Sequence, residues 1–404
     1  MPHNKDNENQ QKDDFKFINE TIKPSNNKKA VLNYILKCCI SGLLFGIFAC
    51  LALYVFRPWL MDVFAKEEEK IVISDVVDKE VEEEYRYDSQ KFIDTFNDLH
   101  DIANSVADSM VSVKPYSYDE TMEKISMESV SGVIMAESDK QYYILSQDSV
   151  CDNTDLWKAQ LRYDITCDIS LVGRDYNLGI AVFSLQKEML PEKASGFIKV
   201  ASLGNSDKLS AGDISLAVGN IFGKTGGTDY GIIKSSDTED ALPDRHCGII
   251  SVDMFPVAEC GGFLFNVEGE VAGLFTSQYY DKKEARALGI SDIKPVIELL
   301  VNGQDVPFMG IYGETISEDA SSEKGIPAGV YVLQIHRNSP AQIAGISNAD
   351  IIYQIDDTEI KTVEEYEQKV LELKPGDIAK VKAKRKGAGS YVDIDFYVTV
   401  DTAK

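Results

Sequence analysis

One stretch of the sequence cannot belong to a soluble domain. The nineteen residues from Cys38 to Phe56 carry no charged side chain. About 20 apolar residues are needed to span a bilayer, so this run predicts a transmembrane helix within residues 30–58. A secretory signal peptide is the alternative. It is disfavoured by the long polar leader and by the absence of a small-residue cleavage pattern at Arg57, Pro58 and Trp59.

The charges on the two sides of the apolar run differ, and the difference predicts an orientation. The preceding side carries the lysines Lys23, Lys28, Lys29 and Lys37, whereas three consecutive glutamates follow at residues 67–69. An excess of lysine and arginine marks the cytoplasmic side. We therefore expect a single-pass protein of the cell membrane with a cytoplasmic N-terminus and extracytoplasmic domains.

The overall charge and the cysteine pattern exclude several classes of partner. The chain has 66 Asp and Glu against 41 Lys and Arg, a net charge of −25, so no basic stripe is expected for nucleic acid. No CxxC pair lies outside the membrane run, so a zinc site is not expected, and neither is any other metal or cofactor. The extracytoplasmic Cys151, Cys167, Cys247 and Cys260 allow up to two disulfides in three connectivities.

The composition changes along the chain and suggests its domain boundaries. Residues 1–29 are polar and predict a disordered cytoplasmic tail, and residues 59–100 predict an acidic, partly helical linker. Between Tyr85 and Met110, apolar residues recur at three-four spacing, as on one face of a helix. This face could form a short coiled coil or pack against the chain's own domain.

Short β-like runs follow, separated by Gly, Asp and Asn turns. They include "SGVIMAE", "QYYILS", "GIAVFSL" and "DISLAVGN", and they predict a β-barrel or sandwich domain over residues 101–303. The region ends in a predicted helix within residues 287–303. Residues 304–404 alternate strands with two helical segments and predict a separate small α+β domain.

The order of these segments resembles the HtrA (DegP-like) family, which has a trypsin-like double β-barrel followed by a PDZ domain. "SGVIMAESDKQYYILSQDSV" resembles the family's strand and "YILTNxHV" motif, and "ASLGNSDKLSAGDISLAVGNIFG" resembles "LGDSDxLxxGxxVxAIGNPFG". "CGGFLFNVEGEVAGLF" resembles "SGGPLFNxxGEVIGI", and "SPAQIAGISNADIIYQIDDTEI" resembles the PDZ run "SPAxxAGLxxGDVIxxIxGxxI". Together the motifs cover roughly residues 100–400. The expected fold is mainly β: the double barrel and PDZ domain, preceded by one transmembrane helix.

The resemblance implies that the catalytic triad is degenerate. The family's histidine position holds Ser149, its aspartate position holds Gly179, and its serine position holds Cys260. A nucleophile needs a base, and the base needs a partner that orients it, so neither role is filled. The oxyanion loop is also altered around Ala258 and Gly261.

Cys260 has two interpretations at this point. It could be a nucleophile with an unconventional base, for which His246 is the only plausible histidine, or it could be a small apolar or disulfide-bonded residue. The second interpretation is favoured, and His246 is expected to be an ordinary strand-end histidine.

The PDZ-like motif implies a site for peptide carboxyl termini. "PFMGIYG" stands in the place of the family's carboxylate-binding loop, so Phe308, Met309, Gly310 and Ile311 are the expected binding residues. Tyr366 and Val370, four residues apart on a helix, are expected to face the groove or, equally, to pack in the core.

Together these features predict a membrane-anchored pseudoprotease of the HtrA type, bacterial by resemblance. It would bind exported or misfolded polypeptides or scaffold envelope quality control. Its expected partners are unfolded chains, carboxyl-terminal peptides, active protease homologues or further copies of itself, in a trimer by resemblance. The alternatives are an active endopeptidase that uses Cys260 and a structural envelope anchor.

Overall fold

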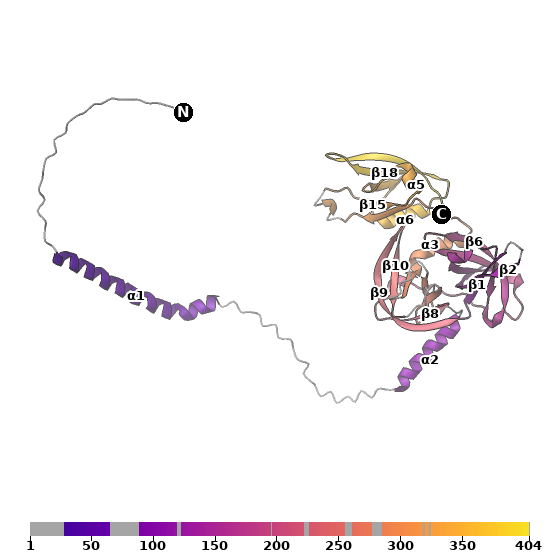
Figure 1. The fold of residues 1–404 in the computed structure, drawn as a ribbon, viewed down its shortest axis with the longest axis horizontal. Helices are drawn as coiled ribbons and strands as arrows, with labels where there is room; N and C mark the ends of the chain where they lie inside the picture. Colours follow the sequence, from indigo (N-terminus) through magenta and orange to yellow (C-terminus); the bar gives the residue numbers. More distant parts are fainter. Residues whose placement is uncertain are drawn as a thin grey trace, which may run out of the picture. The chain divides into compact units, whose positions relative to one another are not determined.

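The computed structural model describes residues 28–64, 89–118, 123–194, 196–221, 226–254, 261–276, 285–317, 320–322 and 325–403. The chain divides into two compact units, Met1–Arg86 and Tyr87–Lys404 (Figure 1). The first unit contains the helix α1, Lys28–Phe64. The second contains all the other elements.

Helix α1 has the length and composition of a membrane span. Its apolar part, Val31–Phe56, has a mean hydropathy of 2.4. At a rise of about 1.5 Å per residue, 26 residues extend about 39 Å, more than the roughly 30 Å hydrocarbon core of a bilayer.

The second unit begins with α2 (Ser89–Val106), which leads into a first β-barrel. Its seven-stranded sheet has the order β2-β1-β3-β4-β7-β6-β5, and an additional pairing of β1 with β5 closes the ring. The strands are β1 (Met110–Tyr118), β2 (Lys124–Ser126), β3 (Val130–Glu137), β4 (Gln141–Gln147), β5 (Leu156–Gln160), β6 (Thr166–Asp175) and β7 (Ile180–Gln186). Short 3-10 turns lie at η1 (Asp148–Cys151), η2 (Arg162–Asp164) and η3 (Lys187–Met189).

A second, closed barrel follows in the order β10-β13-β12-β11-β8-β9. It contains the 3-10 turn η4 (Ser206–Lys208) and the strands β8 (Ile214–Gly219), β9 (Gly227–Leu242), β10 (Arg245–Val252), β11 (Gly262–Phe265), β12 (Val271–Phe275) and β13 (Ala285–Gly289). Helix α3 (Ile290–Val301) ends this part of the chain.

Strand β7 shows why these apolar runs form buried strands. Successive side chains on a strand point to opposite faces. Ile180 and Val182 enter the core shared by the two barrels, α2 and α3, whereas Ala181, Phe183 and Leu185 enter the core of the first barrel. Both faces are buried, and the run is correspondingly apolar without alternation.

The PDZ domain has its own core. Its six-stranded sheet has the order β14-β15-β16-β18-β19, with β17 paired to β16, and its buried side chains form a separate cluster. The elements are β14 (Ile311–Thr315), β15 (Val330–Ile335), α5 (Pro340–Ala344), β16 (Ile351–Ile355), β17 (Thr358–Glu359), α6 (Val363–Leu371), β18 (Ile378–Lys386) and β19 (Tyr391–Thr399). The predicted fold class is confirmed: two barrels, then a PDZ domain, with one apolar helix before them.

The helical pattern predicted up to Met110 is wrong at its C-terminal end. Helix α2 stops at Val106, and Met110 is the first residue of β1. Within α2, Leu99, Ala103 and Val106 pack into the core shared by the barrels. The C-terminal half of the predicted face therefore packs against the chain's own domain, and α2 crosses the boundary expected at residue 100.

Candidate functional site

The structure brings two of the three positions assigned to the triad close together. Ser149 lies in the turn η1 and is exposed, whereas Gly179 immediately precedes β7. The backbone N–H of Asp148 donates to the carbonyl oxygen of Gly179 at 3.0 Å. Gly179 has a φ of +67°, in the left-handed region that favours glycine. Ser149 thus offers only a hydroxyl where the resemblance places a base, and Gly179 offers no side chain where it places the carboxylate that orients that base.

The third position, Cys260, and Ala258 lie outside the described residues. Gly261, the next described residue, is buried, and its carbonyl oxygen accepts a hydrogen bond from the N–H of Asn220 at 2.8 Å.

Gln147 is a buried residue beside this loop that the motif comparison did not single out. Its Nε2 donates to the carbonyl oxygen of Phe275 at 2.6 Å, joining the first barrel to the second. A Cβ added at Gly261 would lie 3.0 Å from the same nitrogen. A side-chain amide therefore occupies the seam between the barrels next to the nucleophile loop. Its place two residues before Ser149 is the one sequence feature that points to it.

Asp148 is the one carboxyl group of η1 and was also not anticipated. Burial, followed by repulsion from Asp152, raises its pKa to about 6, although Arg174 opposes the shift. No hydrogen bond from the Ser149 hydroxyl to Asp148 is found among the described contacts.

The described cysteines of the second unit are free thiols. Cys151, Cys167 and Cys247 have no disulfide partner. Burial raises the pKa of the Cys151 thiol to about 12, and it raises the pKa of Cys247 further. Because the thiolate is the nucleophilic form, burial disfavours a nucleophilic role for Cys151 and Cys247. In the described parts of the chain, no group of three or more His, Cys, Asp or Glu side chains is placed to hold a metal ion.

A second candidate site is the segment Phe308–Ile311, which we call the carboxylate loop. Two of its carbonyl oxygens are bonded within the PDZ domain: that of Met309 accepts from Ala341 N–H at 2.9 Å, and that of Gly310 accepts from His336 N–H at 2.8 Å. Gly310 has a φ of +86°, and a Cβ there would lie 2.3 Å from Ser339 Cβ. Only glycine fits this turn, which directs successive N–H groups to one side.

A carboxylate occupies the convergence point of those N–H groups. It belongs to Asp244, in the two-residue turn between β9 and β10. Asp244 Oδ2 accepts from the N–H groups of Met309 (2.7 Å) and Gly310 (2.6 Å), and its Oδ1 accepts from the N–H of Ile311 (3.0 Å). The hydroxyl of Tyr366 donates to the same Oδ1. Asp244 is 3% exposed.

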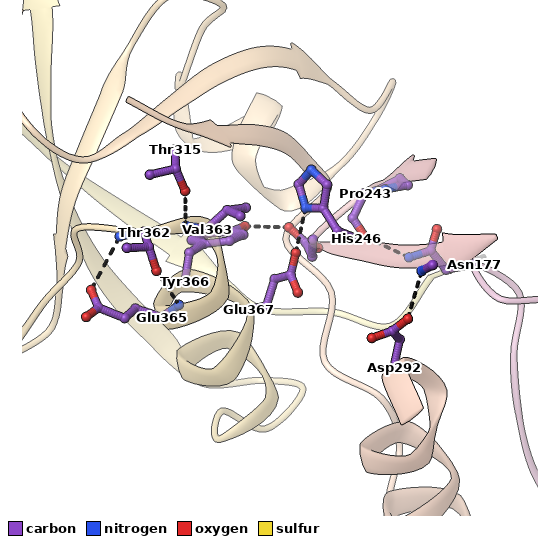
Figure 2. A network of polar contacts seen from close by, with 12 residues as sticks. Asn177, Pro243, His246, Asp292, Thr315, Thr362, Val363, Glu365, Tyr366 and Glu367 are labelled. Atoms are coloured by element: carbon purple, nitrogen blue, oxygen red, sulfur yellow. Dashed lines mark hydrogen bonds and ion pairs between the residues drawn. The ribbon is translucent and has the colours of Figure 1, made fainter. Parts of the chain in front are cut away.

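The surroundings hold this turn and the PDZ helix together (Figure 2). His246 Nδ1 lies 2.7 Å from Glu367 Oε1 on α6, and Asn177 Nδ2 donates to the carbonyl oxygen of Pro243 at 2.7 Å. The hydrogen bond to Glu367 raises the pKa of His246, and burial raises the pKa of Glu367. His246 is a strand-end histidine paired with the PDZ domain.

The remaining residues expected in the groove are covered in this arrangement. Tyr366 and Val370 are each 1% exposed within the PDZ core, Met309 is fully buried, and Phe308 is 8% exposed. At the start of α6, the N–H of Val363 donates to Thr315 Oγ1 at 2.8 Å, which ties the helix to the end of β14 (Figure 2).

Comparison with known proteins agrees with this architecture. Residues 307–396 match the family model described as a PDZ domain. Among solved structures, the HtrA-type protease AlgW with a decapeptide superimposes with a TM-score of 0.53 at 20% identity, over 76% of this chain and 98% of that one. The fold therefore defines a trypsin-like double barrel followed by a PDZ domain.

The curated relatives with similar sequences are serine proteases. The serine protease Do-like HtrB of Bacillus subtilis is 28% identical over 280 residues, which cover 64% of this chain and 59% of the relative. The serine protease Do-like HtrA of the same organism is 26% identical over 327 residues, covering 74% and 71%. The chain is therefore similar to HtrA-type serine proteases in sequence and in fold, and its residues 307–396 match a PDZ domain. It spans less than two thirds of HtrB and of several other relatives that it matches.

Proposed function

We propose that the chain is a membrane-anchored, extracytoplasmic HtrA-type pseudoprotease whose PDZ domain binds the carboxyl termini of exported polypeptides. The observation that carries the binding role is the convergence of three backbone N–H groups on one carboxylate at Met309, Gly310 and Ile311. Successive N–H groups in such a concavity recognise a peptide's terminal carboxylate.

The binding role is tested with the full-length chain in detergent. Matched decapeptides with a free or an amidated C-terminus are titrated. Amidation removes the charge that the N–H groups recognise, so affinity should fall by about 1.5–3 kcal/mol, the range for a hydrogen bond to a charged group. Equal affinity for both forms would rule out the carboxylate loop as the binding site.

The loss of catalysis is supported by the side chains at the triad positions. The Ser149 hydroxyl is not a base near neutral pH, and Gly179 has no side chain to orient one. A missing general base alone typically removes 10²–10⁴-fold in rate. We expect no turnover of a fluorogenic unfolded substrate above background. Turnover that disappears in Cys260→Ala would replace this proposal with a cysteine hydrolase.

Restoring the triad is a stricter test. The single change Cys260→Ser should give no activity, because no base is present. The combination of Ser149→His, Gly179→Asp and Cys260→Ser supplies all three groups. The φ of +67° at position 179 imposes a backbone cost of roughly 1 kcal/mol on the aspartate, which tolerates this region better than most residues.

Anchoring and assembly complete the proposal. Protease added to intact cells should remove everything beyond Arg57 and spare the N-terminal leader, whereas protection of the PDZ domain would reverse the topology. Phe92, Ile93 and Phe96 of α2 are about half exposed, at 53%, 50% and 48%, and offer an apolar surface for assembly with further copies. Light scattering that shows only monomers would remove that part of the proposal.

A further inference from the structure

Asp244 offers the chemical groups of a peptide's last residue. A terminal residue brings a carboxylate and, two bonds away from it, a backbone N–H. Asp244 brings its side-chain carboxylate to Met309, Gly310 and Ile311, and its own backbone N–H donates to the carbonyl oxygen of Ile311 at 2.7 Å. The aspartate differs from a true terminus only by one methylene between these groups.

The geometry leaves no room for a second carboxylate at this point. Both oxygens of Asp244 are fully engaged by four donors, three N–H groups and the Tyr366 hydroxyl. The side chain is 3% exposed, so water does not replace these partners. A peptide terminus reaches the carboxylate loop only after Asp244 has left it.

The turn that carries Asp244 is built to present it. Leu242 pairs with Arg245, so Pro243 and Asp244 alone form the hairpin loop. Asp244 has a φ of +61°, a region where glycine or asparagine is more usual. The Asn177 amide holds the Pro243 carbonyl, and the pair His246–Glu367 fixes the next strand against α6. The hairpin tip is thus supported from the first barrel on one side and from the PDZ helix on the other.

We propose that Asp244 is an internal ligand of the PDZ domain, which competes with carboxyl-terminal peptides and couples their binding to release of the PDZ domain from the barrel. This inference rests on the proposed peptide-binding function. A peptide binds only the fraction of molecules in which Asp244 has left the loop, so its apparent affinity is reduced by that fraction.

The test compares wild type with Asp244→Asn and Asp244→Gly in the full-length chain. Asparagine keeps the shape and tolerates a positive φ, and glycine removes the side chain without backbone strain. The matched control is Asp237→Asn, which changes an exposed acidic residue on β9, the strand that leads into the turn. The probes are fluorescein-labelled decapeptides with Val, Leu, Ile or Phe at the last three positions and a free carboxylate.

We expect both Asp244 variants to bind the best of these peptides at least about tenfold more tightly, because the loss of even one of the competing charged hydrogen bonds accounts for that factor. The control should bind like wild type. Hydrogen exchange measured without peptide should show faster exchange of the amides of residues 309–311 in both variants. Equal peptide affinity in wild type and both variants would overturn the proposal.

The exchange measurement separates the two possible failures. If no peptide binds any form, but the amides of residues 309–311 exchange faster in the variants, the contact of Asp244 with the loop is supported. The proposed peptide-binding function is then contradicted, and with it the proposed competition between Asp244 and peptides. If peptides bind and exchange at residues 309–311 is unchanged by both substitutions, Asp244 does not occupy the loop and the internal-ligand proposal alone is overturned.

Discussion

The ion pair between Arg385 and Asp350 should be a principal determinant of PDZ stability. Arg385 on β18 donates from Nε and Nη2 to the two oxygens of Asp350, both at 2.7 Å. The Asp350 side chain is 1% exposed and the Arg385 side chain 41%. Arg385→Met keeps an apolar chain of similar reach but leaves the buried carboxylate with the N–H of Ser347 as its one remaining described partner.

The expected cost follows from this burial. Breaking a buried pair by removing one partner costs about 3–5 kcal/mol. Because the guanidinium is partly exposed and water reaches its side of the pair, we expect about 3 kcal/mol, the lower end. Lys384→Met is the matched control, because it breaks the neighbouring pair with Asp393, whose side chain is 63% exposed. An exposed pair contributes about 0–1 kcal/mol.

The assay is hydrogen exchange of the β16 and β18 amides in the full-length chain, because a multidomain protein does not unfold in one step. A loss of about 3 kcal/mol corresponds to exchange more than a hundredfold faster, whereas Lys384→Met should change it by less than about fivefold. Equal effects of the two substitutions would show that burial of Asp350 does not set the cost, and the reasoning would be refuted.

Three further predictions concern the rest of the second unit. At pH 7.5, iodoacetamide should leave Cys151 unmodified until the chain is unfolded, because burial raises its pKa to about 12; rapid labelling of the native protein would contradict this. Contact between His246 and Glu367 should weaken as the pH rises. The pKa of each group is raised in the docked state, so the docked state binds more protons than the undocked state. The free energy that protonation contributes to docking is therefore lost from about pH 4.5 upward for Glu367 and from about pH 6.5 upward for His246. Hydrogen exchange of the carboxylate-loop amides, corrected for intrinsic rates, should become faster from pH 6 to pH 8 in wild type, and should change less in His246→Gln. Slower exchange at pH 8 than at pH 6 would contradict the predicted weakening of the contact. Gly310→Ala should reduce peptide affinity at least about tenfold, because its Cβ would overlap Ser339 and turn the N–H groups away; unchanged affinity would place the binding site elsewhere.

Much of the fold could be predicted because the signals are local. Strands such as β7 and β4 are apolar runs between turn residues, and the resemblance fixed their order in two barrels. The strand β1 was missed, because its start at Met110 continues the three-four spacing of the helix before it. Periodicity alone cannot show that the chain turns at residues 107–109.

The contacts of the candidate sites were less predictable, because they join distant segments. The carboxylate loop was expected from its sequence, but its partner Asp244 lies 65 residues before Met309 in a Pro-Asp turn that reads as ordinary turn chemistry. His246 was correctly expected at a strand end, yet its pairing with Glu367 spans 121 residues. Neither pairing leaves a periodic or motif signal, so only the three-dimensional structure brings these residues together.

The position of Asp244 within the same chain has a consequence for how the protein would respond to its surroundings. A tethered group faces its site at an effective concentration that is set by the chain connecting them, on the order of millimolar for short connections, and diluting the protein does not change it. Under our proposal, scattered peptide ends would leave the PDZ domain closed. Only a dense supply of them, such as accumulating chain ends near the membrane, would displace the aspartate. Peptides would then occupy the carboxylate loop only above a threshold concentration of exposed carboxyl termini. That threshold would not depend on how many copies of the protein the cell makes.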